Sequence, residues 1–380
     1  MIRLVIPSIE QDDLQAVSEV LTSGYLVQGP RVAAFEQAIA DYVGTRYAVA
    51  VSNCTAALHL ALLALDTRPG DLVIVTAYSF VATANVIELC GARPVFVDIR
   101  SDTFNLDPNC LEETLDRLMA NSDTAHRVKA ILPVHTFGQM ADMPTILEMA
   151  EQYDLPVIED AACALGATLR GRQAGTWGVM GCFSFHPRKA ITTGEGGIVV
   201  TNDAALACRL RALRNHGLDP DAPSPDFIMP GFNYRMTDFQ AALGLTQMAK
   251  LDRIIAARRR LAVHYDELLQ DMPVQTPAVA PGSRPVYQSY VVLLPEKASA
   301  YRTEIITRLK QQGIETAIGT WHMPMTTYFR SRYGYTVGDW PAADQVFARS
   351  LTLPLYKGLS EEEQGQVVHR LQEAMDEVMK

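Results

Sequence analysis

The chain reads PVIED at residues 156–160 and GCFSFHPRKAITTGEGGIVVT at residues 181–201. Outward from these stretches lie further short apolar, β-branched runs separated by helical patterns: YAVAV (47–51), LVIVT (72–76), PVFVD (94–98) and KAILPV (129–134). This alternation predicts an α/β fold with a mostly parallel sheet that is covered by helices on both faces. Several runs are apolar at consecutive positions, as expected of strands that are buried on both sides. Ligands of such sheets bind at the carboxyl ends of the strands, so the residues after each run are the candidates for chemistry.

The composition is that of a globular protein. The chain has 380 residues, 48% of them hydrophobic, with 33 Lys and Arg against 43 Asp and Glu and a net charge of −10. It is long enough for about two domains, and a disordered chain, a fibrous repeat and a mini-protein are excluded. It contains no long run of Lys or Arg, so we expect neither nucleic acid nor an anionic membrane as a partner. The N-terminus lacks the apolar stretch of a signal peptide, which predicts a cytoplasmic protein.

The cysteines give no sign of a metal site or a disulfide framework. There are six, scattered without a CxxC pair and without a histidine at metal-ligand spacing. Such a pattern is typical of reduced thiols, and we expect no bound metal. The residues are Cys54, Cys90, Cys110, Cys163, Cys182 and Cys208.

The second half of the chain changes character. Residues 214–232 read as a long surface loop, and a capping-box pair, Thr237 and Gln240, predicts a helix that continues to about Leu269. The basic cluster at 258–260 is interpreted as a solvated helix face. Prolines at every fourth residue from 273 to 285 predict a stiff connector, because no helix interior tolerates them. A smaller domain follows, with a strand in YQSYVVLL (287–294), a helix in RTEIITRLKQQ (302–312) and a last helix from Ser360.

Three features carry candidate chemistry. Asp160 ends the PVIED run, although by itself it could be only a helix cap. Lys189 lies in a polar, glycine-rich loop between two strands, where a lone lysine is usually only a solvated charge. The segment SNCTAALHLALLAL (52–65) begins a helix at a strand end, and the first turn of any helix attracts anions. Together, an amine, a carboxylate and a phosphate cradle match the needs of pyridoxal phosphate.

The sequence also resembles a known family, the fold type I pyridoxal-phosphate enzymes called the DegT/DnrJ/EryC1/StrS sugar aminotransferases. The resemblance covers nearly the whole chain, and its most specific part is the block FSFHPRKAITTGEGG. It implies a large domain with a mostly parallel seven-stranded sheet between helices and a smaller C-terminal α/β domain. The expected boundaries are 1–250 for the cofactor-binding domain, with an N-terminal arm at 1–25, and 251–380 for the long helix and the small domain. The other matching blocks are SGYLVQGPRVAAFEQAIADYVG (23–44), AYSFVATANVI (77–87), PVHTFGQMADM (133–143), VIEDAACALGA (157–167), GFNYRMTDFQAALGLTQMAKLD (231–252) and SLTLPLYKGLSEEE (350–363).

The resemblance assigns roles to single residues. It makes Lys189 the lysine that forms a Schiff base with the cofactor and Asp160 the partner of the pyridine nitrogen. The phosphate would be bound by Thr55, Ala56 and Ser184, and by Asn233 of a neighbouring subunit, so that each site of a homodimer needs two chains. Phe80 would stack on the ring or serve as a core aromatic. Tyr25 and His322 match positions near the sugar cleft, with packing or surface roles as the alternative.

Two departures from the family pattern affect this site. The family commonly reads EDAAQAHGA, with the Gln on the ring oxygen of the cofactor, whereas this chain has Cys163 at the Gln position and Leu165 at the His position. A thiol is a weaker hydrogen-bond donor than an amide. The helix start reads NCT where many relatives have SGT, so Asn53 and Cys54 are expected to alter the local geometry.

The resulting hypothesis is a homodimeric aminotransferase that moves an amino group from L-glutamate to a keto sugar, specifically a nucleotide-linked 4-keto-6-deoxyhexose. A 3-keto sugar or an inosose are alternative acceptors. Dehydratases of the same family resemble this chain but carry His where Lys189 stands, so the lysine favours transamination. A non-catalytic regulatory protein is the remaining alternative, and the presence of both Lys189 and Asp160 argues against it.

Overall fold

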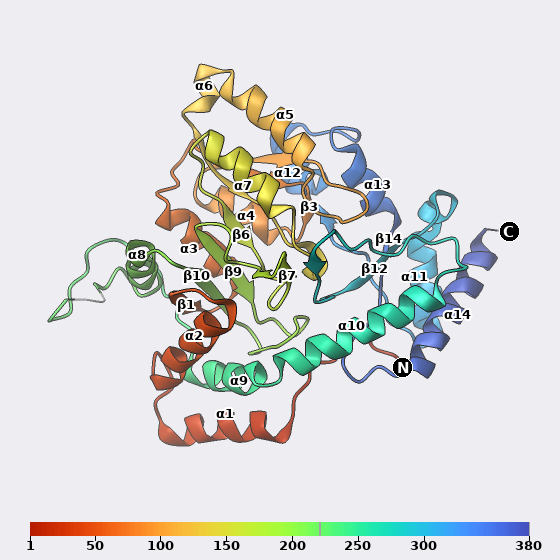
Figure 1. Ribbon diagram of the computed structural model, residues 1–380, viewed down its shortest axis with the longest axis horizontal. Coiled ribbons are helices and arrows are strands. Elements are labelled where there is room, and N and C mark those ends of the chain that lie inside the picture. Colours follow the sequence, from red (N-terminus) through yellow and green to blue (C-terminus); the bar gives the residue numbers. More distant parts are fainter. Residues whose placement is uncertain (220–221, 380) are drawn as a thin grey trace.

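The computed structural model describes residues 1–219 and 222–379, and its centre is a sheet of seven strands. Figure 1 shows several of these strands at the middle of the molecule, among the helices. Parallel bridges from Ile131 to Val157 and from Val134 to Asp160 join a three-stranded and a four-stranded part. All neighbouring strands are parallel except β10, which is antiparallel to both of its neighbours. The predicted mostly parallel sheet is thus confirmed. Its order is β1 (Tyr47–Val51), β10 (Gly197–Thr201), β9 (Met180–Ser184), β6 (Ile158–Asp160), β5 (Val128–Leu132), β2 (Leu72–Thr76) and β4 (Arg93–Val97).

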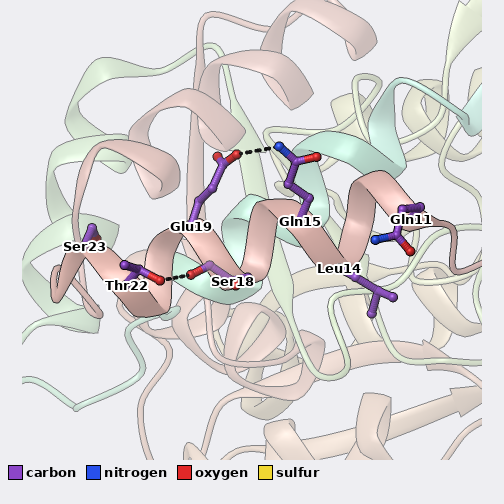
Figure 2. Close-up of a pocket in the computed structure, with 7 residues that line it drawn as sticks. All are labelled: Gln11, Leu14, Gln15, Ser18, Glu19, Thr22 and Ser23. Carbon is purple, nitrogen blue, oxygen red and sulfur yellow. Dashed lines mark hydrogen bonds between the residues drawn. The ribbon is translucent and has the colours of Figure 1, made fainter.

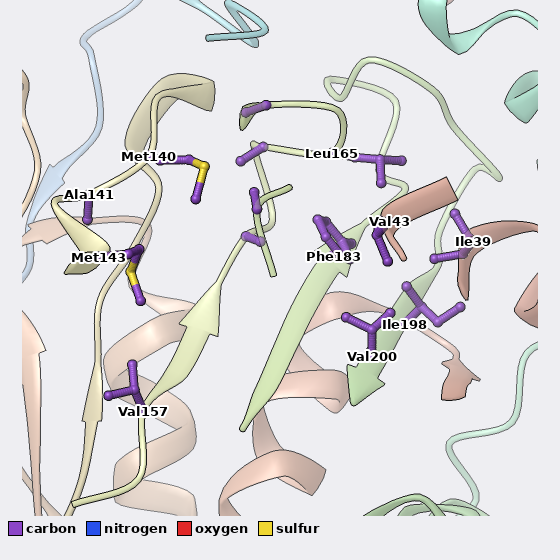
Figure 3. Close-up of a cluster of buried hydrophobic side chains, with 14 of the residues drawn as sticks. Ile39, Val43, Met140, Ala141, Met143, Val157, Leu165, Phe183, Ile198 and Val200 are labelled. Atoms are coloured by element: carbon purple, nitrogen blue, oxygen red, sulfur yellow. The ribbon is translucent and has the colours of Figure 1, made fainter. Parts of the chain in front are cut away.

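Both faces of this sheet are covered, because its strands send alternate apolar residues into two separate cores. Ile198 and Val200 lie in one cluster and Val199 lies in the other. Figure 3 shows Val157, Phe183, Ile198 and Val200 on the first face. That cluster contains residues of α2 (Pro30–Val43), α5 (Pro108–Met119) and α7 (Met143–Gln152), whereas the other contains α3 (Cys54–Ala64), α4 (Ala82–Leu89) and α8 (Ala204–Arg214).

The predicted helix from Thr237 to Leu269 is two helices, α9 (Asp238–Met248) and α10 (Leu251–Leu268). The capping box of Thr237 and Gln240 is confirmed at the start of α9. Lys250 lies at the break, where its Nζ donates to Asp12 Oδ1 at 2.5 Å and to Asp13 Oδ2 at 2.7 Å, close to α1 (Gln11–Ser23). The break therefore accompanies a long-range ion pair that local helical periodicity does not reveal.

The interpretation of residues 258–260 as a solvated face is wrong for Arg258. This side chain is only 2% exposed, and its Nη1 donates to the carbonyl oxygens of Tyr287, Gln288 and Leu355. Arg260 is exposed, as expected, and Arg259 is half-buried. One helix turn thus divides three consecutive arginines between the interior and the solvent.

The C-terminal part has its own core beside α10. There β12 (Tyr290–Leu293) pairs antiparallel with β14 (Ser350–Leu353), flanked by α11 (Arg302–Gln311) and α14 (Glu361–Val378). The capping box that opens α14 at Ser360 is present, as predicted. The predicted connector from 273 to 285 contains no helix, but it includes the short strand β11 (Ser283–Arg284). The division at residues 250 and 251 stays a prediction.

Several elements of this part return to the large sheet. Residues of α12 (Thr327–Tyr333) and α13 (Pro341–Arg349) lie in the same core cluster as α3 and α4, and β13 (Trp321–His322) pairs with β3 (Tyr78–Ser79). None of the helices in the described residues has the length and apolar character to span a bilayer. The remaining short elements are α6 (Ser122–Ala125), β7 (Thr168–Leu169), β8 (Arg172–Gln173), β11 (Ser283–Arg284), η1 (Thr136–Gly138), η2 (Glu296–Tyr301) and η3 (Met323–Met325).

Candidate functional site

A cavity of about 930 Å³ opens at the carboxyl ends of the parallel strands. Its wall includes residues at or just after the ends of five strands, together with two segments of the C-terminal part, 288–289 and 317–321. This is where the sequence pattern placed the chemistry. The cavity brings together seven of the predicted site residues: Thr55, Ala56, Phe80, Asp160, Cys163, Ser184 and Lys189.

Lys189 presents its amine to the cavity from the turn that follows β9. The turn is closed by a hydrogen bond from the Lys189 N–H to the carbonyl oxygen of His186 at 2.8 Å. The Nζ atom donates to Cys163 Sγ at 3.1 Å. Burial lowers the pKa of Lys189, but the electrostatic interaction and the hydrogen bond with Cys163, followed by the interactions with Cys54 and Asp160, hold that pKa above its ordinary value overall.

Asp160 lies at the end of β6, where its side chain is 3% exposed. Its carboxylate accepts from Thr83 Oγ1 at 2.7 Å and from the N–H of Ala162 at 3.1 Å. Burial raises the pKa of Asp160, against the hydrogen bonds and the positive charge of Lys189, which lower it. A buried carboxylate of this kind, placed in a cavity, is suited to a cationic partner on a ligand.

Glu159, the neighbour of Asp160 in the strand, has a separate environment. Its carboxylate accepts from the N–H groups of Gly175, Trp177 and Gly178 at 2.6–2.8 Å, and its Oε2 lies 2.8 Å from His135 Nε2. Successive strand residues point to opposite faces, which separates the two carboxylates. Asp160 lines the cavity, whereas Glu159 fixes the turn behind it.

The start of α3 forms another part of the wall, with one departure from the expected arrangement. Asn53 is the N-cap, and its Oδ1 accepts the N–H of Ala56 at 2.8 Å. Ala56 was predicted to give this N–H to a phosphate, but here the N–H is engaged within the protein. The hydroxyl-bearing Thr55 is exposed and lines the cavity. An anion bound here would contact Thr55. To bind the N–H of Ala56 as well, the anion would have to compete with the Asn53 side chain.

Three predicted residues do not line the cavity of their own chain. Tyr25 is 73% exposed, and Asn233 is exposed beside Tyr234, which does line it. His322 is 2% exposed and its Nδ1 lies 3.3 Å from Asp344 Oδ1. Its neighbour Trp321 reaches the cavity instead. The sugar-binding roles of Tyr25 and His322 and the phosphate role of Asn233 stay predictions.

Several cavity residues were not singled out from the sequence. Thr83, which donates to Asp160, lies in the quoted block AYSFVATANVI, and its position one turn after Phe80 was the available signal. Arg188 stands next to Lys189 and also lines the wall. His59, His186, Glu195 and Tyr234 also line the cavity and lie in the blocks that carry the family resemblance. Local patterns do not indicate Gln288 or Trp321.

A second hollow lies along the outer face of α1. Figure 2 shows that its lining residues come from this one helix, and the hydrogen bonds drawn, Gln15 to Glu19 and Thr22 to Ser18, run along it. A single exposed helix face offers no converging groups for chemistry, so the cavity at the sheet is the candidate active site. The described residues contain no group of three or more His, Cys, Asp or Glu side chains that could hold a metal ion.

Comparison with known proteins identifies the family of this chain. The family model described as "DegT/DnrJ/EryC1/StrS aminotransferase family" matches residues 7–372. The GDP-perosamine synthase of Caulobacter vibrioides is 40% identical over 100% of this chain and 98% of its own length. The solved structure of Helicobacter pylori PseC, an aminotransferase involved in the biosynthesis of pseudoaminic acid, is 27% identical, with a TM-score of 0.91 and coverage of 99% of both chains. The PLP-form of Spr1654 from Streptococcus pneumoniae is 27% identical, with a TM-score of 0.91 over 99% of this chain and 98% of that one. This chain therefore belongs to the DegT/DnrJ/EryC1/StrS aminotransferase family, and it is a transaminase.

Proposed function

We propose that this enzyme uses pyridoxal 5′-phosphate to move an amino group from L-glutamate to a keto sugar, specifically a nucleotide-linked 4-keto-6-deoxyhexose. The observation that carries the proposal is the convergence of Lys189, Asp160 and the start of α3 on one cavity. An amine, a buried carboxylate and a helix N-terminus are the groups that this cofactor requires. The PLP-form of a structure with the same fold supports the choice of cofactor.

The donor set of the cavity fits the cofactor. Asp160 would hold the protonated ring nitrogen, Thr55 and Ser184 would hold the phosphate through their hydroxyls, and Phe80 would cover the ring. Cys163 would stand near the ring oxygen, in place of the usual amide. When bound, the cofactor supplies a ring that stabilises negative charge on the reacting carbon.

Two residues of the chain would move a proton and stabilise charge during the reaction. With the cofactor bound, the Lys189 amine would move a proton to and from the reacting carbon of the substrate through Nζ. The buried carboxylate of Asp160 would hold the ring nitrogen in its protonated form. The transfer from L-glutamate and the transfer to the sugar use the same Nζ in opposite directions.

The acceptor is inferred from relatives. The name GDP-perosamine synthase specifies a nucleotide-linked amino sugar, and that protein aligns with the whole of this chain. We propose that the acceptor of this chain is also linked to a nucleotide. A 3-keto sugar or an inosose would use the same cofactor groups, because Lys189 and Asp160 serve the transfer of an amino group to any ketone.

We also propose a homodimer with shared sites. Asn233 and Tyr25 are exposed and lie outside the cavity of their own chain, where a second copy could receive them. Cross-linking tests this arrangement: an Asn233→Cys variant should be linked to the cofactor phosphate site of the partner subunit. Recovery of monomers alone would contradict the arrangement.

The visible absorption spectrum of the purified protein tests the proposal. The lysine-bound cofactor absorbs in the visible range, and adding L-glutamate without any sugar should bleach this band. Lys189→Ala should abolish the band and turnover. A protein that takes up pyridoxal phosphate but is not bleached by L-glutamate would exclude glutamate as the donor and favour a dehydratase or a regulatory protein.

A further inference from the structure

Arg188 has a fixed backbone next to the reactive lysine. Its N–H donates to His186 Nδ1 at 3.2 Å, and its carbonyl oxygen accepts from Gln288 Nε2 at 2.9 Å. Gln288 is itself held by the buried Arg258, whose Nη1 donates to the Gln288 carbonyl oxygen at 3.0 Å. The main chain at Arg188 is therefore anchored on both sides, by its own turn and by the C-terminal part.

The guanidinium of Arg188 has no ion-pair partner in the described part of the chain. The side chain is exposed and lines the cavity. It is the single arginine among the described lining residues, whose acidic members are Asp160 and Glu195. Asp160 accepts hydrogen bonds from the Thr83 hydroxyl and the Ala162 N–H, and neither Asp160 nor Glu195 forms an ion pair with Arg188 in the described residues. An arginine that is held at a cavity wall without a carboxylate is available to a ligand.

The positive charge of Arg188 acts on the cavity itself. Burial lowers the pKa of His186, and the charges of Lys189 and Arg188 lower it further, against Glu195, which raises it. The start of α3 offers a separate anion site through Thr55. The cavity thus has two places for anions, and the proposed function fills only the second one with the cofactor phosphate.

We propose that Arg188 binds an anionic group of a substrate at the exposed rim of the cavity. This inference rests on the proposed function, in which every substrate is an anion: glutamate has an α-carboxylate, and a nucleotide sugar has a diphosphate. A guanidinium matches both groups, because its parallel N–H donors bond two oxygens at once. The shared chemistry is a pair of anionic oxygens.

Three variants test the role of Arg188 in the holoenzyme. Arg188→Gln removes the positive charge, and Arg188→Lys keeps the charge but lacks the paired N–H donors of a guanidinium. Arg330→Gln is the control, because it removes an exposed arginine outside the cavity lining. Stopped-flow bleaching gives the apparent Kd and the limiting rate for L-glutamate. Calorimetry gives the Kd for guanosine, uridine and thymidine diphosphates.

We expect Arg188→Gln to weaken the binding of one class of probe by about tenfold or more, the loss expected for a charge-assisted hydrogen bond. Arg188→Lys should fall between this variant and the wild type, and Arg330→Gln should match the wild type. Weaker glutamate binding with an unchanged limiting rate assigns Arg188 to the donor carboxylate. Weaker nucleotide binding alone assigns it to the diphosphate.

Unchanged affinity for all probes in Arg188→Gln, in an enzyme that L-glutamate still bleaches, overturns this inference and leaves the proposed function intact. A wild-type enzyme that L-glutamate does not bleach contradicts the proposed donor, but calorimetry still decides whether Arg188 binds a diphosphate. If the wild type binds no probe, the inference and the proposed function both fail.

Discussion

The Nζ atom of Lys189 lies 3.1 Å from the Sγ atom of Cys163, at the position where the family pattern has a glutamine. An amide would offer both a donor and an acceptor to the cofactor ring, whereas a thiol is weak in both roles. In this chain the position instead contacts the reactive lysine. The substitution therefore changes the environment of the amine as well as the contact to the ring.

Cys163→Ala should lower the pKa of Lys189. Burial lowers this pKa, and Cys163 contributes the largest effects in the opposite direction, so that removing its sulfur leaves burial less opposed. A lower pKa means that more of the amine is neutral, and nucleophilic, at a given pH. The rate at which the apoprotein captures added pyridoxal phosphate should therefore reach half of its maximum at a lower pH.

A stopped-flow series over pH, following the visible band, measures this midpoint. Cys110→Ala is the matched control, because Cys110 lies in α5 and does not line the cavity. An unchanged midpoint in Cys163→Ala would show that the thiol does not raise the pKa of Lys189.

Asp160→Asn should keep the fold and the bound cofactor but slow the chemistry. An asparagine oxygen can still accept from Thr83, whose hydroxyl donates to Asp160 at 2.7 Å. The variant loses the negative charge under the ring nitrogen, and we expect bleaching by L-glutamate to slow by about 10²–10³-fold. The apoprotein should be no less stable to heat, because burial of the charged carboxylate is unfavourable. Bleaching at the wild-type rate would remove Asp160 from the mechanism.

The strands were the most predictable part of the fold. The run GIVVT coincides with β10, and YAVAV and LVIVT coincide with β1 and β2. Each is a short β-branched run that is buried on both faces, so local composition and burial favour the same structure. Asp160 and Lys189 followed from the same pattern, because the residues after parallel strands meet at one edge of the sheet.

The parts that were not predicted depend on contacts between distant segments. Gln288 and Trp321 reach the cavity only because the C-terminal part packs on the large sheet. The break between α9 and α10 coincides with the contact of Lys250 with Asp12 and Asp13, which are far away in the sequence. The hydrogen bond from the Ala56 N–H to Asn53 is local in sequence. It was not predicted, because the same N–H was assigned to the cofactor phosphate.

Asn53→Gly should free the N–H of Ala56 for the cofactor phosphate. Glycine is tolerated as an N-cap at a cost of a few tenths of a kcal/mol, whereas Asn53→Ala should cost about 1 kcal/mol of stability. Both variants remove the acceptor that holds this N–H at 2.8 Å. We expect both to bind pyridoxal phosphate about threefold to tenfold more tightly, the gain of one hydrogen bond.

Absorbance titration of the apoprotein measures this affinity, and a thermal melt separates the two variants. Weaker binding in both would mean that Asn53 itself holds the phosphate, and that the change from SGT to NCT supplies a new contact.

Arg258→Met should destabilise the protein more than any change on the exposed side of α10. Arg258 is 2% exposed, burial lowers its pKa to about 10, and it is therefore charged at neutral pH while its Nη1 donates to three carbonyl oxygens. A methionine fills similar space but leaves these three carbonyl oxygens without their donor, at a cost of about 2–4 kcal/mol. Arg260→Met, two residues along the same helix, removes an exposed side chain and should change stability by less than about 0.5 kcal/mol.

Urea unfolding of both variants gives the comparison, with the slope of the transition as a check that the same surface is exposed. Because Arg258 also fixes the carbonyl of Gln288, its loss should loosen the cavity wall at Arg188; equal stability of the two variants would mean that water replaces the guanidinium at all three oxygens.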